Sequence, residues 1–505
     1  MKKKLVLTAL ILGSIALFFA IAFSEIEVIT KAIILLVLLG VTGWLIQKIT
    51  GIEGYNGLLV LKGAHGFNLM RNIAEKHGET AKKIADFGLV LGFGLPYGYY
   101  LFKKNKKYLV YAAISSLFFI FPWITNPENF STQATTIMGL ALGLFGIGLY
   151  SLAQNAFNIL TTPGTPAGVS ILIPGVTVPY EAIIAIIIIA AVHELAHGVL
   201  AYAEKIEIKS SGALLFGFLP IGAFVEPDEK KFEKQPITKK RRVLIAGSTS
   251  NFLFFLVFLA LWISLTPLLP TLVSGVGITN STIQGITAGA IITSIDGESF
   301  NSQTEYYNKL LNEANNDNKI LVETNEWKKE IPATSITLEQ VFDFSVNKDV
   351  LKDGEVIYAI NGKHLNSVKE LGDELKQYSP SEQLVLETSN GNKTIFLDEK
   401  GRIGANFMQV PSIQFQNIPK NAIIYALMMV VLTIVYWTFL LNFILATVNL
   451  LPIFITDGHR IIKNELQHVF GEKGKKIALA ISLFVLLLIL INALPALNIS
   501  FPWFN

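Results

Sequence analysis

The stretch that decides the fold is Ala182-Ile-Ile-Ala-Ile-Ile-Ile-Ile-Ala-Ala-Val-His-Glu-Leu-Ala-His197, in which an uncharged run leads directly into a His-Glu-x-x-His motif. On a helix, His193 and His197 lie one turn apart on one face, an arrangement that suits a shared zinc ion. Glu194 lies beside them as a base for water. Because ionisable groups are costly inside a membrane, their presence in this apolar run indicates a functional site.

The composition indicates a polytopic α-helical membrane protein. The chain has 505 residues, of which 51% are hydrophobic and 16% charged, and its mean hydropathy is +0.50. The net charge of +3 does not point to nucleic acid, since the basic residues stand in short loops beside apolar runs. The chain has no cysteine, so a zinc ion must be held by His, Asp or Glu.

Nine apolar segments are candidate membrane spans. They are residues 5–23, 32–46, 87–102, 108–123, 137–152, 182–200, 243–266, 423–451 and 477–496. The first follows Lys2-Lys3-Lys4 without a clear cleavage site, so we expect an uncleaved signal anchor.

Residues 270–416 differ from the rest of the chain and predict a water-soluble insertion. Charge density rises, apolar runs shorten, and the sequence repeats. The segment 289–297 (GAIITSIDG) matches 354–362 (GEVIYAING), and each copy predicts a strand followed by an Asp-Gly or Asn-Gly turn.

Each copy resembles a PDZ domain, which implies two tandem α+β domains at 270–335 and 336–416. PDZ domains bind extended peptides at a sheet edge, often through a free carboxylate. The resemblance therefore implies an extracytoplasmic peptide as a partner. Neither copy shows a recognisable peptide-cradling loop, so a steric cap without peptide affinity is an equal alternative.

Two basic segments predict the orientation in what is expected to be the cell membrane. Residues 230–242 and 460–476 are rich in Lys and Arg, so both are predicted to be cytoplasmic. The insertion then lies outside, and His193 lies towards the cytoplasmic end of its helix. The basic loop 103–107 does not fit this pattern if every candidate segment spans.

The third metal ligand must come from elsewhere in the chain, and Asp457 is the best candidate. It ends the stretch Asn449-Leu-Leu-Pro-Ile-Phe-Ile-Thr-Asp-Gly458, and no charged residue occurs from 421 to 456. Pro452 obstructs a helix, and a broken helix inside a membrane persists only where it lines a cavity enclosed by protein. A helix-ending Asp-Gly turn without a metal is the alternative.

In this order, H-E-x-x-H and N-x-x-P-x-x-x-x-D-G resemble the site-2 protease family of intramembrane zinc metalloproteases. Gly247 and Asn251 match that family's G-x-x-x-N helix, and 212–228 resembles its membrane-associated β-hairpin. The resemblance implies a protease core in two halves, 165–269 and 417–505. Residues 1–164 lie outside it, and their role is left open.

The resemblance also implies the roles of the site residues. His193, His197 and Asp457 hold zinc, Glu194 is the catalytic base, and Asn251 and Asn449 stabilise the oxyanion or position the substrate. Helix–helix hydrogen bonding is an equal alternative for the two asparagines. The expected activity is regulated intramembrane proteolysis, with a transmembrane segment of another protein as the substrate.

Two other functions remain possible on sequence alone. One is a non-catalytic membrane receptor or scaffold that collects peptides with the PDZ-like domains. The other is a membrane zinc protease with a soluble catalytic chamber, but that class takes its third ligand from a downstream Glu on a helix. The stretch around Asp457 favours the intramembrane type.

Overall fold

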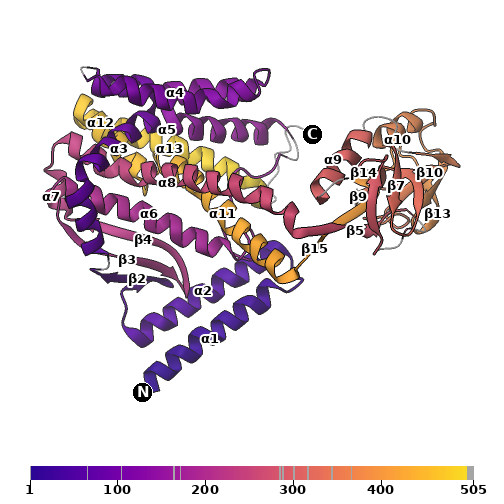
Figure 1. The fold of residues 1–505 in the computed structure, drawn as a ribbon, viewed down its shortest axis with the longest axis horizontal. Coiled ribbons are helices and arrows are strands. Elements are labelled where there is room, and N and C mark those ends of the chain that lie inside the picture. Colours follow the sequence, from indigo (N-terminus) through magenta and orange to yellow (C-terminus); the bar gives the residue numbers. More distant parts are fainter. Residues whose placement is uncertain are drawn as a thin grey trace. The chain divides into compact units, whose positions relative to one another are not determined.

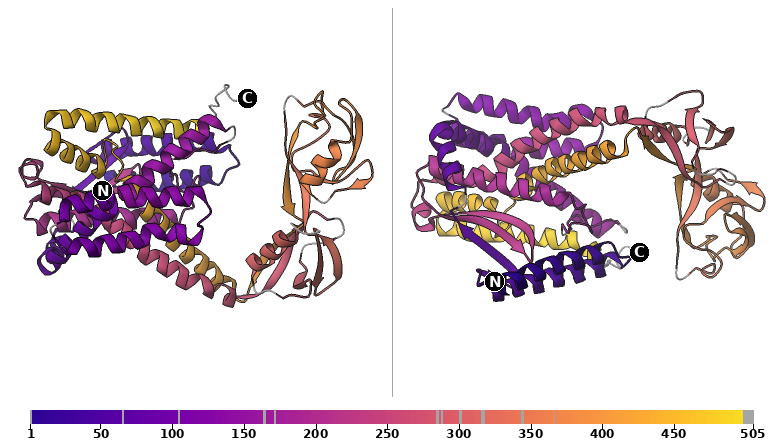
Figure 2. Two further views of the ribbon diagram at one scale, coloured as in Figure 1. Left: turned by 90° about the horizontal axis from the view of Figure 1, so that it is seen from above. Right: turned by 60° about the horizontal axis from the view of Figure 1, so that its bottom comes forward.

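The computed structural model describes two compact units (Figures 1 and 2). The helical unit comprises Met1–Ile263 and Val430–Asn505, and the strand-rich unit comprises Ser264–Met429. The described residues are all those outside 1, 65, 104, 163–164, 171, 284–285, 287–288, 300–301, 315–317, 343–344, 366 and 498–505.

Within the described residues, eight helices are long and apolar enough to cross a membrane. They are α1 (Lys2–Ala22), α2 (Val28–Thr50), α4 (Lys107–Thr125), α5 (Phe130–Thr161), α6 (Ala182–Ala203), α8 (Ile237–Leu265), α11 (Ala422–Val448) and α13 (Glu472–Ala493). This set fits a polytopic membrane protein.

The predicted span at 87–102 forms the second half of α3 (Phe67–Phe102), which is not one of these eight helices. Its glycines and tyrosines make it less apolar than the other segments, and it contains Pro96. Gly94 also interrupts the helix with φ 85° and ψ 175°, a conformation that glycine adopts at little cost. Helix α5 has a similar break at Gly143 (φ 67°, ψ −155°) and is one of the eight, so the lower hydropathy of residues 87–102, and not the break, separates α3 from them.

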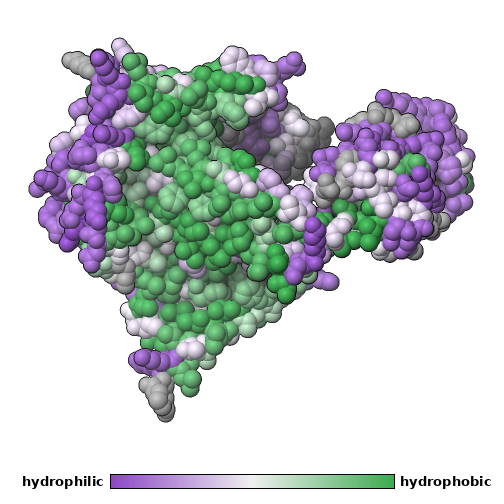
Figure 3. Space-filling model, in the orientation of Figure 1, coloured by the Kyte–Doolittle hydropathy of each residue, from purple (hydrophilic) through white to green (hydrophobic). Residues whose placement is uncertain are grey.

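The surface of the helical unit supports a membrane environment. Figure 3 shows a broad hydrophobic face on this unit. Large apolar side chains on its helices are strongly exposed, such as Leu117 at 72% and Leu5 at 73%. Contiguous apolar surface of this extent is rare on soluble monomers and fits contact with lipid.

The core of the helical unit joins α3, α6 and α8 to the segment that follows α11. Its buried side chains include Leu89 on α3, Val199 on α6, Ile245 on α8 and Leu450 beyond α11. Segments far apart in the sequence thus pack into one cluster, and the candidate site residues lie on these same elements.

A four-stranded antiparallel sheet also belongs to the helical unit. Strands β3 (Ile208–Phe216) and β4 (Leu219–Pro227) pair over the segment in which the sequence predicts a hairpin. Strands β1 (Gly54–Tyr55) and β2 (Leu58–Gly63) extend it, with β2 paired to β3. Among the described residues β4 has a strand on one side only, so its other edge is open.

In its described residues, the strand-rich unit contains two sheets, each accompanied by one α-helix, and it also includes two short 3-10 helices and the start of α11. The first sheet has the order β15-β5-β6-β7-β8, and the second has the order β13-β12-β10-β9-β14 with β11 beside β10. The bounds are β5 Val273–Ser281, β6 Ile291–Ile295, β7 Lys319–Thr324, β8 Lys328–Pro332, β9 Thr334–Val341, β10 Val356–Ile360, β11 Lys363–His364, β12 Gln383–Thr388, β13 Gly391–Phe396, β14 Ala405–Pro411 and β15 Ile413–Pro419; the helices are α9 (Gln303–Ala314) and α10 (Val368–Leu375).

The two sheets contain the same turn, which reflects the sequence repeat. Asp296 and Asn361 both have positive φ, as do the glycines that follow them. The side chain of Asp296 accepts a hydrogen bond from the backbone N–H of Leu321 on β7, and Asn361 accepts the equivalent bond from Val385 on β12, both at 2.8 Å. The final strand, β15, returns to pair with β5, so residues 413–419 complete the first sheet rather than the second.

Candidate metal centre

Helix α6 presents His193 and His197 to the same point. The residues are one helical turn apart, and their Nε2 atoms lie 3.1 Å from each other. Both side chains are buried, with 8% and 9% of the residue exposed. Two buried imidazoles with facing nitrogens need a shared partner, and a proton or a metal ion can fill that role.

Asp457 reaches the two imidazoles from the other half of the chain. Helix α11 ends at Val448, and helix α12 (Asp457–Phe470) begins after a turn, with the Thr456 side chain accepting a hydrogen bond from the backbone N–H of His459 as its N-cap. The Oδ2 atom of Asp457 lies 3.4 Å from Nε2 of His193 and 3.0 Å from Nε2 of His197. The three predicted ligands are therefore brought together.

The ring orientation of His197 is set by the backbone of α8. Its Nδ1 lies 2.7 Å from the carbonyl oxygen of Val243. Because a carbonyl only accepts, Nδ1 carries a proton and donates it, so in the neutral ring that binds a metal the lone pair lies on Nε2, which faces Asp457. A second hydrogen bond of this kind fixes the tautomer of histidines that bind metals.

Gly247 allows α8 to approach the two imidazoles. A Cβ atom at this position would lie 2.3 Å from Cε1 of His193 and 2.5 Å from Nε2 of both histidines. Any larger residue would have to displace the imidazoles or the helix. The glycine of the G-x-x-x-N pattern is therefore required by packing against the site.

The three residues fit a zinc ion. Zinc lies about 2.0–2.2 Å from His nitrogen and carboxylate oxygen in a tetrahedral site, which places two ligand atoms about 3.3 Å apart. The three separations here, 3.1, 3.4 and 3.0 Å, agree with that spacing. Two imidazole nitrogens and one carboxylate oxygen are a donor set that zinc takes in proteins.

Glu194 lies beside the ligands and is held by the hairpin. Its Oε2 accepts a hydrogen bond of 2.8 Å from the backbone N–H of Val225 on β4. This N–H points away from β3, so the open edge of β4 faces the motif.

His193 and Glu194 open into a cavity of about 500 Å³. Its walls come from α2, the loop before α6, α6 itself, the β3–β4 hairpin and α11, through residues that include Leu36, Pro174, Ile186, Phe216, Ala223 and Leu445. Nearly all of the lining is apolar, and the two ionisable groups lie at one place in it. The motif therefore borders an apolar cavity.

Comparison with known proteins agrees with this geometry. The sequence model of peptidase family M50 matches residues 181–491, more than half of the chain. The chain belongs to peptidase family M50. This is the site-2 protease family of metallopeptidases, and the buried His-His-Asp group of this chain is a candidate site for the metal. Helices α1 to α5 lie outside the match.

One relative of this chain comes from Methanocaldococcus jannaschii. The Uncharacterized protein MJ0971 of Methanocaldococcus jannaschii is 27% identical to this chain over 307 residues. The match covers 60% of this chain and 61% of the relative. The name of the relative gives no activity, so the comparison indicates no substrate.

The two candidate asparagines, Asn251 and Asn449, occupy different environments. Asn449 donates from Nδ2 to Oδ2 of Asp457 at 2.6 Å, and the same nitrogen lies 3.2 Å from Nε2 of His193. Asn251 is completely buried, one helical turn beyond Gly247 on the same face of α8, and neither atom of its amide has a hydrogen-bond partner among the described residues. Asn449 therefore touches the ligand set, whereas Asn251 has unused polar capacity.

Several groups at the site were not predicted from the sequence. The backbone carbonyl of Val243 and the backbone N–H of Val225 carry no signal in their side chains. Leu36 and Leu39 place α2 in the wall of the cavity, although α2 belongs to residues 1–164, to which the sequence assigned no role. An apolar run predicts a span, but it does not indicate which other helix it meets.

Proposed function

We propose that this protein is an intramembrane zinc endopeptidase that cleaves peptide bonds within or near transmembrane helices of other proteins. The observation that carries the proposal is the meeting of His193, His197 and Asp457 within a unit built of membrane-length helices. A non-catalytic protein has no use for this buried group, because burying ionisable side chains there is costly.

Metal binding and proton transfer are assigned to different residues of the site. His193 and His197 hold zinc as neutral imidazoles, and Asp457 holds it as a carboxylate. A bound zinc ion supplies Lewis acidity, which acidifies water and polarises the scissile carbonyl. Glu194 takes a proton from the water and later gives it to the leaving amine.

The substrate binds as an extended strand along the open edge of β4. A helix has its peptide groups hydrogen-bonded internally, so a transmembrane substrate has to unwind before its carbonyl can react. The outward N–H and C=O groups of Ala223 and the C=O group of Val225 offer new partners for the released backbone, while the N–H of Val225 is bonded to Glu194. Because Val225 also contacts Glu194, a strand paired here lies against the catalytic base.

Asn449 and Asn251 are proposed to act on the substrate. The side chain of Asn449 is already adjacent to the ligands, and its amide can donate to a developing oxyanion. Asn251 lies on the Gly247 face of α8 with both amide atoms free to bind a substrate backbone. Both assignments would supply hydrogen-bond partners to the N–H and C=O groups of a peptide backbone inside an apolar cavity.

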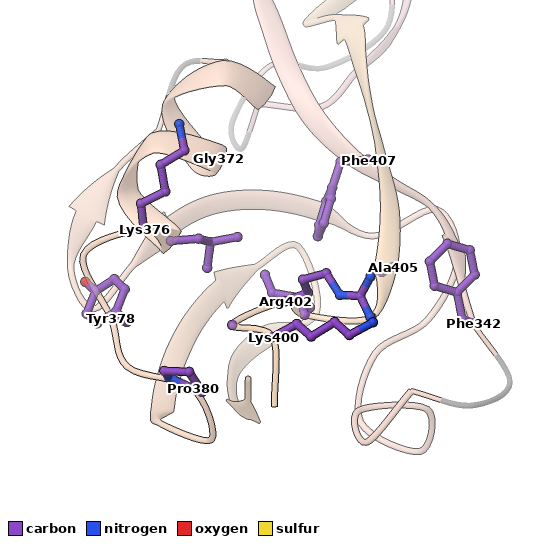
Figure 4. A pocket seen from close by; sticks show the side chains of 13 residues that line it. Phe342, Gly372, Lys376, Tyr378, Pro380, Lys400, Arg402, Ala405 and Phe407 are labelled. Atoms are coloured by element: carbon purple, nitrogen blue, oxygen red, sulfur yellow. The ribbon is translucent and has the colours of Figure 1, made fainter. Parts of the chain in front are cut away.

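The strand-rich unit is proposed to bind peptides outside the membrane. A pocket of about 520 Å³ is lined by α10, the residues after it, the loop 400–404 and β14 (Figure 4). In the described part of the chain β14 pairs with β9 only, so its outer edge can accept a further strand. Lys400 has no ion pair with a described residue and suits a free terminal carboxylate.

The proposed orientation follows the basic residues. Segments 230–242 and 460–476 face the cytoplasm of the cell membrane, and the strand-rich unit lies outside. A PDZ-like unit there suits regulated intramembrane proteolysis, in which substrates are first trimmed outside.

The alternative is a receptor or scaffold that uses only the strand-rich unit, and the pocket beside β14 favours it. Zinc content distinguishes the two functions, because a scaffold does not need an occupied metal site. One zinc ion per chain supports the peptidase, and a purified protein that takes up none overturns it.

The test of the activity is the Glu194→Gln variant with a helical membrane substrate in detergent. We expect zinc to be retained and cleavage to be lost, because the amide cannot accept the proton. Glu472→Gln is the matched control, since Glu472 is exposed and paired with Lys475. Cleavage by the Glu194→Gln variant at the rate of the control removes Glu194 from the proposed role.

A further inference from the structure

Helix α3 lies outside the family match, yet it contacts two elements that build the metal centre. A Cβ atom on Gly88 would lie 1.8 Å from Oγ1 of Thr249 on α8. A Cβ atom on Gly92 would lie 3.1 Å from Ile245 on α8 and 3.2 Å from Leu450, the residue after Asn449. The backbone of α3 is therefore in close contact with both.

Helix α8 is held between α3 and the imidazoles. At about 100° per residue, positions 242, 245 and 249 share one face of α8, and position 247 lies on the roughly opposite face. The first face meets α3 through Ile245 and Thr249. The second face meets His193 and His197 through Gly247. The position of α3 therefore limits how far α8 can move away from the site.

An ion-pair network fixes this contact. The carboxylate of Asp86 on α3 accepts two hydrogen bonds from Arg242 on α8, from Nε at 2.7 Å and from Nη2 at 2.9 Å. Nη1 of the same guanidinium donates to Glu204, at the end of α6, at 3.0 Å. The three side chains are 15%, 27% and 5% exposed, so the network is largely shielded from water. Arg242 thus joins α3, α6 and α8 at one point.

The network lies next to the bond that orients His197. Arg242 directly precedes Val243, whose carbonyl accepts the Nδ1 proton of His197 at 2.7 Å. Glu204 lies on α6 seven residues beyond His197, so the network fixes both helices near this hydrogen bond. A shift of α8 relative to α6 would lengthen the bond and release the tautomer of His197.

We propose that Asp86 is a positioning residue of the metal centre, which acts through Arg242 and the Val243 carbonyl to orient His197. This rests on the proposed function, since it assumes that the His-His-Asp group binds zinc. It also gives part of the segment 1–164 a role. Helix α3 lies outside the family match, yet its Asp86 helps to hold α8 against the metal centre. Asp86 is not a catalytic residue, because its carboxylate is hydrogen-bonded to Arg242 and not to the metal ligands.

The inference predicts a change in metal affinity and not only in stability. Loss of partners that orient metal ligands typically reduces metal affinity or activity by about 10–100-fold. We therefore expect Asp86→Asn to weaken zinc binding by about tenfold in competition with a chelator, and to alter the visible spectrum of the cobalt-substituted protein. Asp86→Glu keeps the charge and should recover part of the affinity.

The control is Ser14→Ala. Ser14 accepts a buried hydrogen bond of 2.9 Å from Thr42, which links α1 and α2 and includes no residue of the site. This variant should lower the thermal unfolding temperature and leave zinc affinity unchanged. An Asp86→Asn protein that behaves in the same way, less stable but with the zinc affinity and cobalt spectrum of the parent, overturns the inference.

A second variant covers the case in which Asp86→Asn does not fold. Arg242→Lys keeps the positive charge but cannot form the two-pronged contact with Asp86, so it should also weaken zinc binding. Parental affinity in this variant counts against the inference. If the parent chain itself binds no zinc, the proposed function fails first, and that result is visible before any variant is compared.

Discussion

The side-chain nitrogen of Asn449 lies 2.6 Å from Oδ2 of Asp457, the oxygen that also faces both imidazoles. Asn449 follows the last residue of α11, and Asp457 is the first residue of α12, so this hydrogen bond closes the turn between the two helices. The backbone N–H of Gly458 donates to the carbonyl of Asn449 at 2.8 Å and closes the same turn. The orientation of the carboxylate is therefore set within its own loop.

Replacement of Asn449 should impair the site without unfolding the chain. Asn449→Ala removes the donor that orients Asp457, so we expect kcat/KM to fall by about tenfold or more and zinc affinity to fall by a similar factor. Asn421→Ala at the start of α11 is the control, since it removes a helix cap and should cost only about 1 kcal/mol of stability. Equal zinc affinity in the two variants would contradict this reading of Asn449.

Gly247→Ala tests the close approach of α8. The new methyl group would overlap the imidazoles at 2.3–2.5 Å, so the helix or the histidines must move and zinc affinity should fall by more than about tenfold. Gly13→Ala on α1 is a matched change with no atom within 4 Å. Zinc titration of both variants measures the effect, and tight binding by Gly247→Ala would show that the packing is not required.

Removal of the carboxylate ligand should empty the site. We expect the zinc content of the Asp457→Ala variant to be well below one ion per chain at micromolar zinc, because two imidazoles alone bind zinc weakly. Metal analysis after gel filtration gives the stoichiometry, with Asp373→Ala as the control, since Asp373 is exposed and pairs with Lys376. An unchanged stoichiometry would mean that the third ligand lies elsewhere.

The open edge of β4 can be blocked at one backbone group. Ala223→Pro removes an N–H that points away from β3, and proline is tolerated at such an edge position. Zinc binding should persist while cleavage of a membrane substrate falls at least tenfold, because the substrate strand loses a partner. Ala223→Val keeps the N–H and should retain most of the activity. Full cleavage by the proline variant would remove strand addition from the mechanism.

The pocket beside β14 should prefer peptides with a free terminal carboxylate. Titration of the full-length protein with one peptide in its free and amidated forms tests this, and we expect the free form to bind at least tenfold more tightly. Lys400→Glu should abolish the difference, whereas Lys369→Glu outside the pocket should preserve it. Equal binding of both peptide forms by the parent protein would favour a steric cap.

The sequence named candidate ligands and a candidate base, but it did not indicate the groups that hold them in place. His193, Glu194 and His197 could be identified because their spacing is local and their setting is apolar. Asp457 could be identified because it is the first charge after a long uncharged stretch. The tandem repeat also appeared correctly as two copies of one turn, since Asp-Gly and Asn-Gly favour positive φ locally.

The sequence alone determined which residues can bind a metal and which segments are apolar enough to enter a membrane, because both depend on side-chain type and short-range spacing. Only the tertiary structure decided what surrounds them. The Val243 carbonyl on His197, the Val225 N–H on Glu194 and the Asp86–Arg242 contact join residues 31 to 156 positions apart. Backbone groups are identical at every position, so folding rather than residue type selects which of them orient the site.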